Sequence, residues 1–254
     1  ADVRRICAQG SGALRVTANS DQEAPLDFYL TPPHPCSYLD RSDAQTLFAD
    51  PRRIITSTAY QQLSAQGFRR SGGHLYRPRC NHCNACIAVR IPISGFRPTR
   101  GQRRTSKRNQ DLTVQIEPAR FTPRHYQVYE RYISMRHTDG DMYPASEDQF
   151  KSFLLCAWAD TQFVCLYLGE QLLSVAVTDQ LDDGLSAVYT FFEPTESSRS
   201  LGVFSILQQI EQCKRQGLSH LYLGYWIKES PKMAYKSQYR PLQMFIEGRW
   251  LTLN

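Results

Sequence analysis

The sequence has no acidic residue between Pro51 and Gln110, although this segment carries thirteen of the Arg and Lys side chains. The rest of the chain holds the other 17 cations and all 24 acids, so the net charge of +6 combines a basic segment with an acidic remainder. Clustered cations release counterions from phosphates and steer association, which favours a polyanionic or acidic partner. The alternative is a basic face that only water solvates.

Long apolar runs are also missing. No stretch approaches 18 consecutive apolar residues, and the first ten residues lack the apolar run of a secretory signal. We therefore expect a cytoplasmic protein that has no membrane partner and acts as a monomer. A length of 254 residues with 41% hydrophobic residues is enough for a substantial core.

The order of apolar patterns predicts a mixed α/β sheet with helices on its faces. Helices are expected over residues 54–68, 123–137, 146–157 and 201–216. Strands are expected over residues 74–77, 89–93, 112–117, 163–168, 172–178, 185–192 and 221–226. The proline within 89–93 suggests an edge strand, because proline cannot donate to a strand ladder.

The second half of the chain has the element order of the acetyltransferase-like (GNAT) fold. In that fold two parallel strands separate on either side of a long helix, and the acyl carrier binds in the gap at the helix N-terminus. The loop from Ser197 to Gly202 has one glycine and matches a coenzyme A loop only in part, which leaves room for another carrier. We expect a basic, cysteine-containing region over 1–115 and the acetyltransferase-like region over 116–254.

Several ordered segments carry a specific resemblance. They are CSYL at 36–39, LYRPRCNHCNAC at 75–86, FRPTRGQRR at 96–104, YLGYWI at 222–227 and KMAYK at 232–236. With these segments the chain resembles the bacterial aspartate/glutamate leucyltransferases, which are relatives of the arginyl-tRNA–protein transferases. The resemblance implies transfer of leucine from leucyl-tRNA to the N-terminal Asp or Glu of proteins, which marks them for degradation in the N-degron pathway. Arginine is the alternative donor, because the residues alone do not separate the two.

A substrate with an acidic N-terminal residue needs a cationic partner for its carboxylate. An arginine fork binds carboxylates in a bidentate way. We assign this role to Arg77, with Arg69, Arg70 and Tyr76 as helpers. The alternative is that an arginine beside Tyr76 stacks on the ring and covers the strand.

The densest cationic run has six Arg and Lys residues within twelve positions. Such density favours phosphate contacts to the tRNA acceptor arm. The residues are Arg97, Arg100, Arg103, Arg104, Lys107 and Arg108.

Three cysteines share a C-x2-C-x2-C spacing, and a fourth precedes them in a proline-rich loop. Four sulfur ligands suit zinc or an iron–sulfur cluster, and free cysteines packed near the core are the alternative. The residues are Cys36, Cys80, Cys83 and Cys86. The chemistry itself requires no cofactor.

An aminoacyl ester is already activated, so the enzyme has to position an α-amine against it and stabilise the oxyanion. The candidate catalytic residues follow the last strands of the predicted sheet, and aromatic core packing is the alternative for each tyrosine. They are Tyr189, Tyr225, Lys236 and Tyr239. A coenzyme A-dependent N-acetyltransferase and a non-enzymatic RNA-binding module remain the competing functions.

Overall fold

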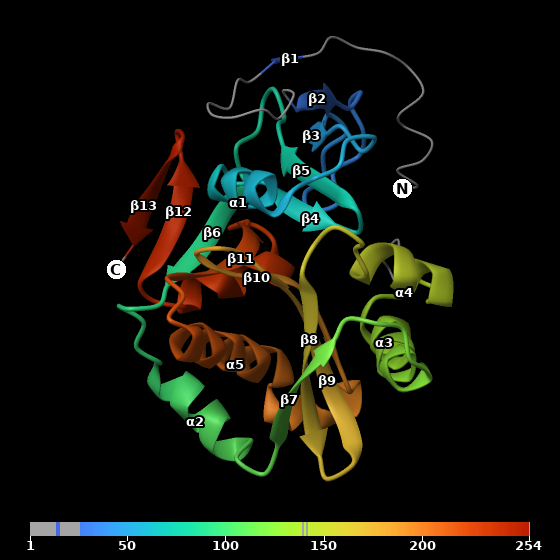
Figure 1. Ribbon diagram of the computed structural model, residues 1–254, viewed down its shortest axis with the longest axis vertical. Coiled ribbons are helices and arrows are strands. Elements are labelled where there is room, and N and C mark those ends of the chain that lie inside the picture. The colour runs from blue at the N-terminus through green and yellow to red at the C-terminus, as the bar shows by residue number, and fades with distance from the viewer. Residues whose placement is uncertain (1–13, 16–25, 139, 141, 254) are drawn as a thin grey trace.

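A computed structural model describes residues 14–15, 26–138, 140 and 142–253, and it contains two sheets (Figure 1). The smaller sheet is antiparallel and has the order β1-β2-β3-β5-β4. Its strands are β1 (Leu14–Arg15), β2 (Asp27–Leu30), β3 (Thr46–Ala49), β4 (Arg69–Ser71) and β5 (His74–Pro78). Hydrophobic side chains of this sheet pack with Leu181 and Tyr222 of the second half, so the two sheets share one core region.

The larger sheet has the order β13-β12-β6-β11-β10-β9-β8-β7. Its strands are β6 (Ile87–Pro92), β7 (Thr113–Pro118), β8 (Thr161–Leu168), β9 (Gln171–Gln180), β10 (Gly184–Phe192), β11 (His220–Trp226), β12 (Leu242–Ile246) and β13 (Arg249–Leu253). Among the described strands only β10 and β11 pair in parallel. The predicted mixed α/β class is confirmed.

Helices cover both faces of the larger sheet (Figure 1). The helices are α1 (Ser57–Ala65), α2 (Arg100–Arg108), α3 (Pro123–Arg136), α4 (Glu147–Leu154), α5 (Leu201–Gln216) and α6 (Pro231–Ala234), with 3-10 turns η2 (Pro194–Arg199) and η3 (Tyr235–Gln238). On β9, Leu172 packs with α3 and α4, whereas its neighbour Leu173 packs with α5. Adjacent strand residues point to opposite faces, so α5 lies on the face opposite α3 and α4.

Among the described residues, no helix has both the length and the apolar character that a membrane crossing needs.

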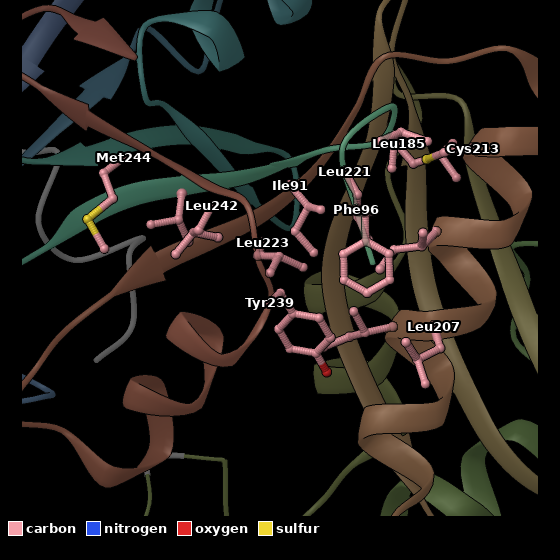
Figure 2. Close-up of a cluster of buried hydrophobic side chains, with 14 residues drawn as sticks. Ile91, Phe96, Leu185, Leu207, Cys213, Leu221, Leu223, Tyr239, Leu242 and Met244 are labelled. Carbon is pink, nitrogen blue, oxygen red and sulfur yellow. The ribbon is translucent and has the colours of Figure 1, made fainter. Parts of the chain in front are cut away.

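The parallel pair β10 and β11 separates soon after it begins. Only Gly184 to Ser186 of β10 pair with β11, at His220 to Tyr222. A Cβ at Gly184 would lie 2.3 Å from the carbonyl oxygen of His220, so the close approach at the paired end needs glycine. Side chains of β6, β10, β11, β12 and α5 form a hydrophobic cluster around this pair, and the cluster also contains Phe96 and Tyr239 (Figure 2).

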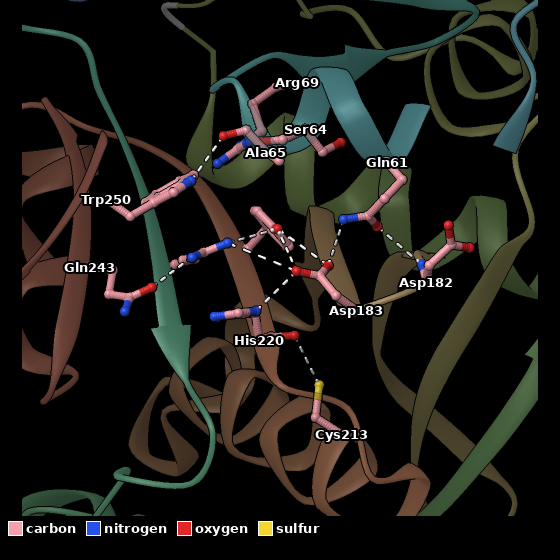
Figure 3. A network of polar contacts seen from close by, with 12 residues as sticks. Gln61, Ser64, Ala65, Arg69, Asp182, Asp183, Cys213, His220, Gln243 and Trp250 are labelled. Atoms are coloured by element: carbon pink, nitrogen blue, oxygen red, sulfur yellow. Dashed lines mark hydrogen bonds and ion pairs between the residues drawn. The ribbon is translucent and has the colours of Figure 1, made fainter. Parts of the chain in front are cut away.

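A polar network holds the paired end of the two strands (Figure 3). The carboxylate of Asp183 accepts hydrogen bonds from Gln61 at 2.8 Å and Tyr222 at 3.0 Å, and it lies 3.0 Å from Nδ1 of His220. Gln61 belongs to α1, and the other two residues belong to β11. The network therefore connects the helix beside the smaller sheet to the larger sheet.

The prediction that residues 89–93 form an edge strand is wrong. β6 lies inside the larger sheet, between β12 and β11. Pro92 is its last residue, and β12 pairs only with Val89 and Arg90, so the missing N–H of Pro92 interrupts no bond to β12. This edge of the sheet is β13, which pairs with β12, and the sequence patterns revealed neither strand. The division at residue 115 stays a prediction, and β6 of the first region shares a sheet with strands of the second.

Candidate active site

A cavity of about 710 Å³ lies between the smaller sheet, β6 and the hairpin of β12 and β13. Arg77, Arg79 and Tyr225 line it together with four cysteines. The lining cysteines are Cys36, Cys80, Cys83 and Cys86. Residues far apart in the sequence that were predicted for substrate binding, catalysis and metal ligation thus face one space.

The four thiols supply the ligand type of a zinc or iron–sulfur site, but the surroundings of Cys86 disfavour the thiolate form. Burial, followed by the charges of the other three cysteines, raises the pKa of Cys86 to about 12. The thiol of Cys80 lies 3.4 Å from the backbone nitrogen of Gln45, which donates to it. Among the described residues, the group of three donors at ligand spacing lies elsewhere and contains none of these four thiols. We therefore derive no chemical step through a metal at the cysteines.

That other group joins Glu117 of β7, His125 of α3 and Cys165 of β8, whose ligand atoms lie within 4.8 Å of one another. Nε2 of His125 is 3.3 Å from Glu117 and 3.8 Å from the sulfur of Cys165. Burial lowers the pKa of His125 and raises the pKa of Cys165, so both side chains are neutral. The sequence did not reveal this group, because its members lie on three separate elements.

Arg77 is the predicted carboxylate ligand that faces the cavity. Its Nη1 donates to the backbone oxygen of Gln66 at 2.8 Å, and its guanidinium lies 4.9 Å from the ring centre of Phe68. These contacts engage the guanidinium itself, and Arg77 lines the cavity. The stacking alternative is seen in part, although the ring is Phe68 and not Tyr76.

Arg70 has a structural partner that accounts for its donors. Its Nε and Nη2 donate to Asp179 at 2.6 and 2.8 Å, and neither side chain is exposed. Nη1 donates to the backbone oxygen of Gly72 at 2.9 Å. This corrects the expectation that Arg70 helps to bind the substrate, because its fork is already engaged in the interior.

Arg69 is buried as well, yet it has no acidic partner among the described residues. Nη1 donates to the backbone oxygens of Ser64 and Phe68, whereas Nε and Nη2 have no hydrogen-bond partner. Its guanidinium lies over the rings of Tyr222 and Tyr225, at 5.2 and 6.0 Å from their centres. Arg69 is thus a fixed charge behind the cavity wall.

The tyrosine candidates differ in the contacts that their side chains already make. The hydroxyl of Tyr225 donates to the backbone oxygens of Gly67 and Tyr76, at 2.9 and 3.1 Å, so Tyr225 positions the wall of the cavity. The ring of Tyr76 lies 5.9 Å from that of Tyr225. Tyr239 is buried with no hydrogen-bond partner for its hydroxyl (Figure 2). Tyr189 packs against Phe153 in the cluster of α3 and α4.

Lys236 lies on η3, beside β11. The side chain is buried, and its Nζ donates to the backbone oxygen of Tyr225 at 2.6 Å. Burial, followed by the nearby charge of Arg69, lowers its pKa to about 7. A buried lysine of this kind is neutral in a large fraction of molecules at neutral pH and can both donate and accept a proton.

Five of the six cations of the dense run lie on helix α2, and Arg97 precedes it. The sequence patterns did not identify this helix, because it has no apolar periodicity. A capping box starts it, in which Thr99 and Gln102 exchange hydrogen bonds with each other's backbone N–H groups. All six predicted tRNA-binding cations are exposed. They are Arg97, Arg100, Arg103, Arg104, Lys107 and Arg108.

Helix α2 packs against α5. At its end, Arg108 donates to the backbone oxygen of Ser198, and Asn109 donates to that of Arg199 at 2.8 Å. Near its start, Gln102 donates to the backbone oxygen of Gln238 at 3.3 Å. One basic helix therefore contacts both the loop before α5 and the turn that carries Lys236.

Family models and individual relatives both match most of this chain. Family models described as "Arginine-tRNA-protein transferase, N terminus" and "Arginine-tRNA-protein transferase, C terminus" match residues 34–104 and 124–246. An aspartate/glutamate leucyltransferase from Hahella chejuensis is 54% identical over 228 residues, which cover 90% of this chain and 97% of that protein. The protein of the same name from Alcanivorax borkumensis is 56% identical over 225 residues, with coverages of 89% and 93%.

A solved structure is more distant. The structure of L-PGS from Bacillus licheniformis is 14% identical, covers 67% of this chain and 51% of that chain, and gives a TM-score of 0.39. A likeness at this level decides nothing about the activity of the chain.

Proposed function

The chain belongs to the arginine-tRNA-protein transferase family, and from that premise we propose that it transfers leucine from leucyl-tRNA to the N-terminal Asp or Glu of proteins. It is an aminoacyltransferase, as are the relatives that are 54% and 56% identical over the aligned residues. The added leucine marks the substrate for degradation in the N-degron pathway. We place the reaction in the cytoplasm, where a monomer meets charged tRNA.

The observation that carries the proposal is the arrangement around the segment from Tyr225 to Lys236. Helix α2 contacts the turn of Lys236 through Gln102, and the cavity of Arg77 reaches the same segment through Tyr225. A tRNA end held by α2 and a peptide end held in the cavity would therefore approach one place from two sides.

The tRNA side rests on charge and exposure. The cations of α2 point to solvent, because only Gln102 and Thr105 of this helix are buried. Exposed Arg and Lys side chains in a row contact phosphates of the backbone without reading the sequence. Such contacts position the acceptor arm, and the amino acid is then presented to the gap between β10 and β11.

The peptide side rests on Arg77. Its guanidinium faces a cavity large enough for an amino-acid side chain, and a carboxylate is the ligand that matches this fork best. A neutral residue at the peptide N-terminus would give this half-buried cation no opposite charge to pair with. The cavity therefore favours Asp and Glu over Asn and Gln.

A GNAT-type arrangement is part of this proposal. The parallel strands β10 and β11 separate after three residue pairs, and the N-terminus of the 16-residue helix α5 lies beside the loop of Ser198 that α2 contacts. Unpaired N–H groups at a helix N-terminus stabilise negative charge, so this end suits a phosphate or an oxyanion. We also keep residues 1–115 and 116–254 as the two functional regions.

A zinc ion or an iron–sulfur cluster at the four cysteines would act as a structural clip for the cavity loops. Its support is that all four thiols line one cavity. Metal analysis of the purified protein, compared with a variant in which Cys80, Cys83 and Cys86 are replaced by serine, tests this part alone.

The function is tested by incubating the protein with leucyl-tRNA or arginyl-tRNA and a peptide that begins with Glu. We expect the peptide mass to increase by one leucine residue with the first tRNA. A matched peptide that begins with Gln should stay unmodified. Arginine transfer would reassign the donor, and no transfer from either tRNA would reject the aminoacyltransferase function of this site.

A further inference from the structure

Lys236 is a buried lysine that lacks the usual compensation. It is 6% exposed, and its Nζ contacts the backbone oxygen of Tyr225 at 2.6 Å and the sulfur of Met233 at 3.2 Å. Lysines are almost never buried unless an acid pairs with them. No salt bridge of Lys236 occurs among the described residues, and the contacts of its amine are with uncharged groups.

Arg69, which lies near Lys236, is also buried without an acidic partner among the described residues. This arginine is 5% exposed, and two of its nitrogens have no hydrogen-bond partner. Its neighbour in sequence, Arg70, is fully paired with Asp179. Two basic groups buried close together without a carboxylate disfavour the charged form of the weaker base, which is the lysine.

Tyr225 and Gly224 place Lys236 at the reaction segment. Tyr225 contacts Arg69 with its ring and Lys236 with its carbonyl oxygen, and it lines the cavity. Gly224 has a φ of +78° at a bulge in β11, and a Cβ there would lie 3.8 Å from Nζ. Gly224 therefore lies beside the amine with no side chain of its own between them.

We propose that Lys236 is the proton acceptor of the transfer reaction, and that Arg69, as an unpaired buried charge near it, is the positioning residue that suits it to this role. The inference rests on the proposed function. In the reaction, the α-amine nitrogen of the peptide bonds to the ester carbon of leucyl-tRNA, and Nζ accepts one proton from that nitrogen. The bond from carbon to the ribose oxygen then breaks, and Lys236 returns the proton to this oxygen. An amide and a free ribose hydroxyl result, and Lys236 is neutral again.

The groups that face Lys236 support this assignment. Arg69 comes from β4, Tyr225 from β11 and Tyr235 from its own turn, with the Nζ 5.9 Å from the ring centre of Tyr235. Burial, with a smaller contribution from Tyr132, raises the pKa of Tyr235 to about 12, so it stays neutral. Burial and Arg69 lower the pKa of Lys236 to about 7, where a general base works best at cellular pH.

A titration followed by NMR tests the electrostatic part without any reaction. The lysine side chains are labelled with carbon-13, and the Lys236 signal is assigned by its loss in Lys236→Met. We expect a midpoint near pH 7 in the unmodified protein, a rise of about one pH unit in Arg69→Gln, and no rise in Arg69→Lys, which keeps the charge. A midpoint near that of exposed lysines, or one that Arg69→Gln leaves in place, overturns the role of Arg69.

Single-turnover transfer between pH 6 and pH 9 tests the catalytic part. We expect Lys236→Met to lower the rate at least about 100-fold with unchanged tRNA affinity, whereas the exposed control Lys151→Met keeps the full rate. Arg69→Gln should be about tenfold slower at pH 6 and recover towards pH 9. A full rate in Lys236→Met would show that Lys236 is not the proton acceptor, and the proposed function would still hold. If the unmodified protein transfers no leucine, the function fails, and the NMR titration still decides the electrostatics.

Discussion

Replacement of Asp179 by alanine should be among the most damaging single changes in this chain. The carboxylate accepts hydrogen bonds from Arg70 at 2.6 and 2.8 Å, from Tyr60 at 2.6 Å and from Thr161 at 2.7 Å. Neither Arg70 nor Asp179 is exposed, so no water replaces the lost partner. An unpaired buried charge costs about 3–5 kcal/mol, which is a large part of the about 5–15 kcal/mol that stabilises a domain.

Urea unfolding measures this cost, and a double variant separates it from the loss of packing. Arg70→Met with Asp179→Leu removes both charges, so we expect it to regain most of the stability lost in Asp179→Ala. The control is Lys214→Ala, which breaks an exposed pair with Glu211 and should change stability by less than about 1 kcal/mol. If Asp179→Ala costs no more than this control, the pair does not hold β4 to β9.

Three further predictions concern neighbouring features of the fold. Burial lowers the pKa of Lys236 from 10.5 to about 7, so the unfolded state binds more protons than the folded state between these two pH values. The free energy of unfolding, measured with urea, should therefore rise from pH 7 to pH 10. Lys236→Met should flatten this rise. Gly184→Ala should lower stability by about 1–3 kcal/mol in the same assay, because a Cβ would lie 2.3 Å from the carbonyl oxygen of His220. Thr99→Ala removes the N-cap of α2 and should cost about 1 kcal/mol in thermal unfolding; an unchanged melting temperature would mean that the capping box does not stabilise this helix.

Local patterns predicted the long elements well. Helix α5 begins at Leu201 and ends at Gln216 as expected, because its apolar spacing is regular and Gly217 stops it with a φ of +68°. Helix α2 has no apolar stripe, so only the Thr99 and Gln102 pair could have revealed it. The position of β6 depends on strands that follow it by more than a hundred residues, and no local signal contains that information.

The candidate site was predictable in its residue types more than in its contacts. Arg69 and Arg70 are adjacent and identical in type, yet only Arg70 meets Asp179, which lies 109 residues away. The sequence indicated that cations gather near an acidic substrate, but it could not show which of them a buried carboxylate would occupy. Lys236 was identified as a candidate, whereas its burial near Arg69 without an acidic partner among the described residues emerges only from the packing of β4 against β11.

The central claim is that two substrates reach the segment from Tyr225 to Lys236 from opposite sides, and paired single-turnover measurements test it most directly. Arg104→Gln with Lys107→Gln on α2 should weaken leucyl-tRNA binding, reduce its salt slope by about 1.5–2, and leave the KM of a Glu peptide unchanged. Arg77→Met should raise the peptide KM and leave tRNA binding unchanged, while the control Arg120→Gln with Lys151→Gln should alter neither. The account is contradicted if either variant weakens tRNA binding and peptide binding equally, or if neither variant weakens the binding of either substrate.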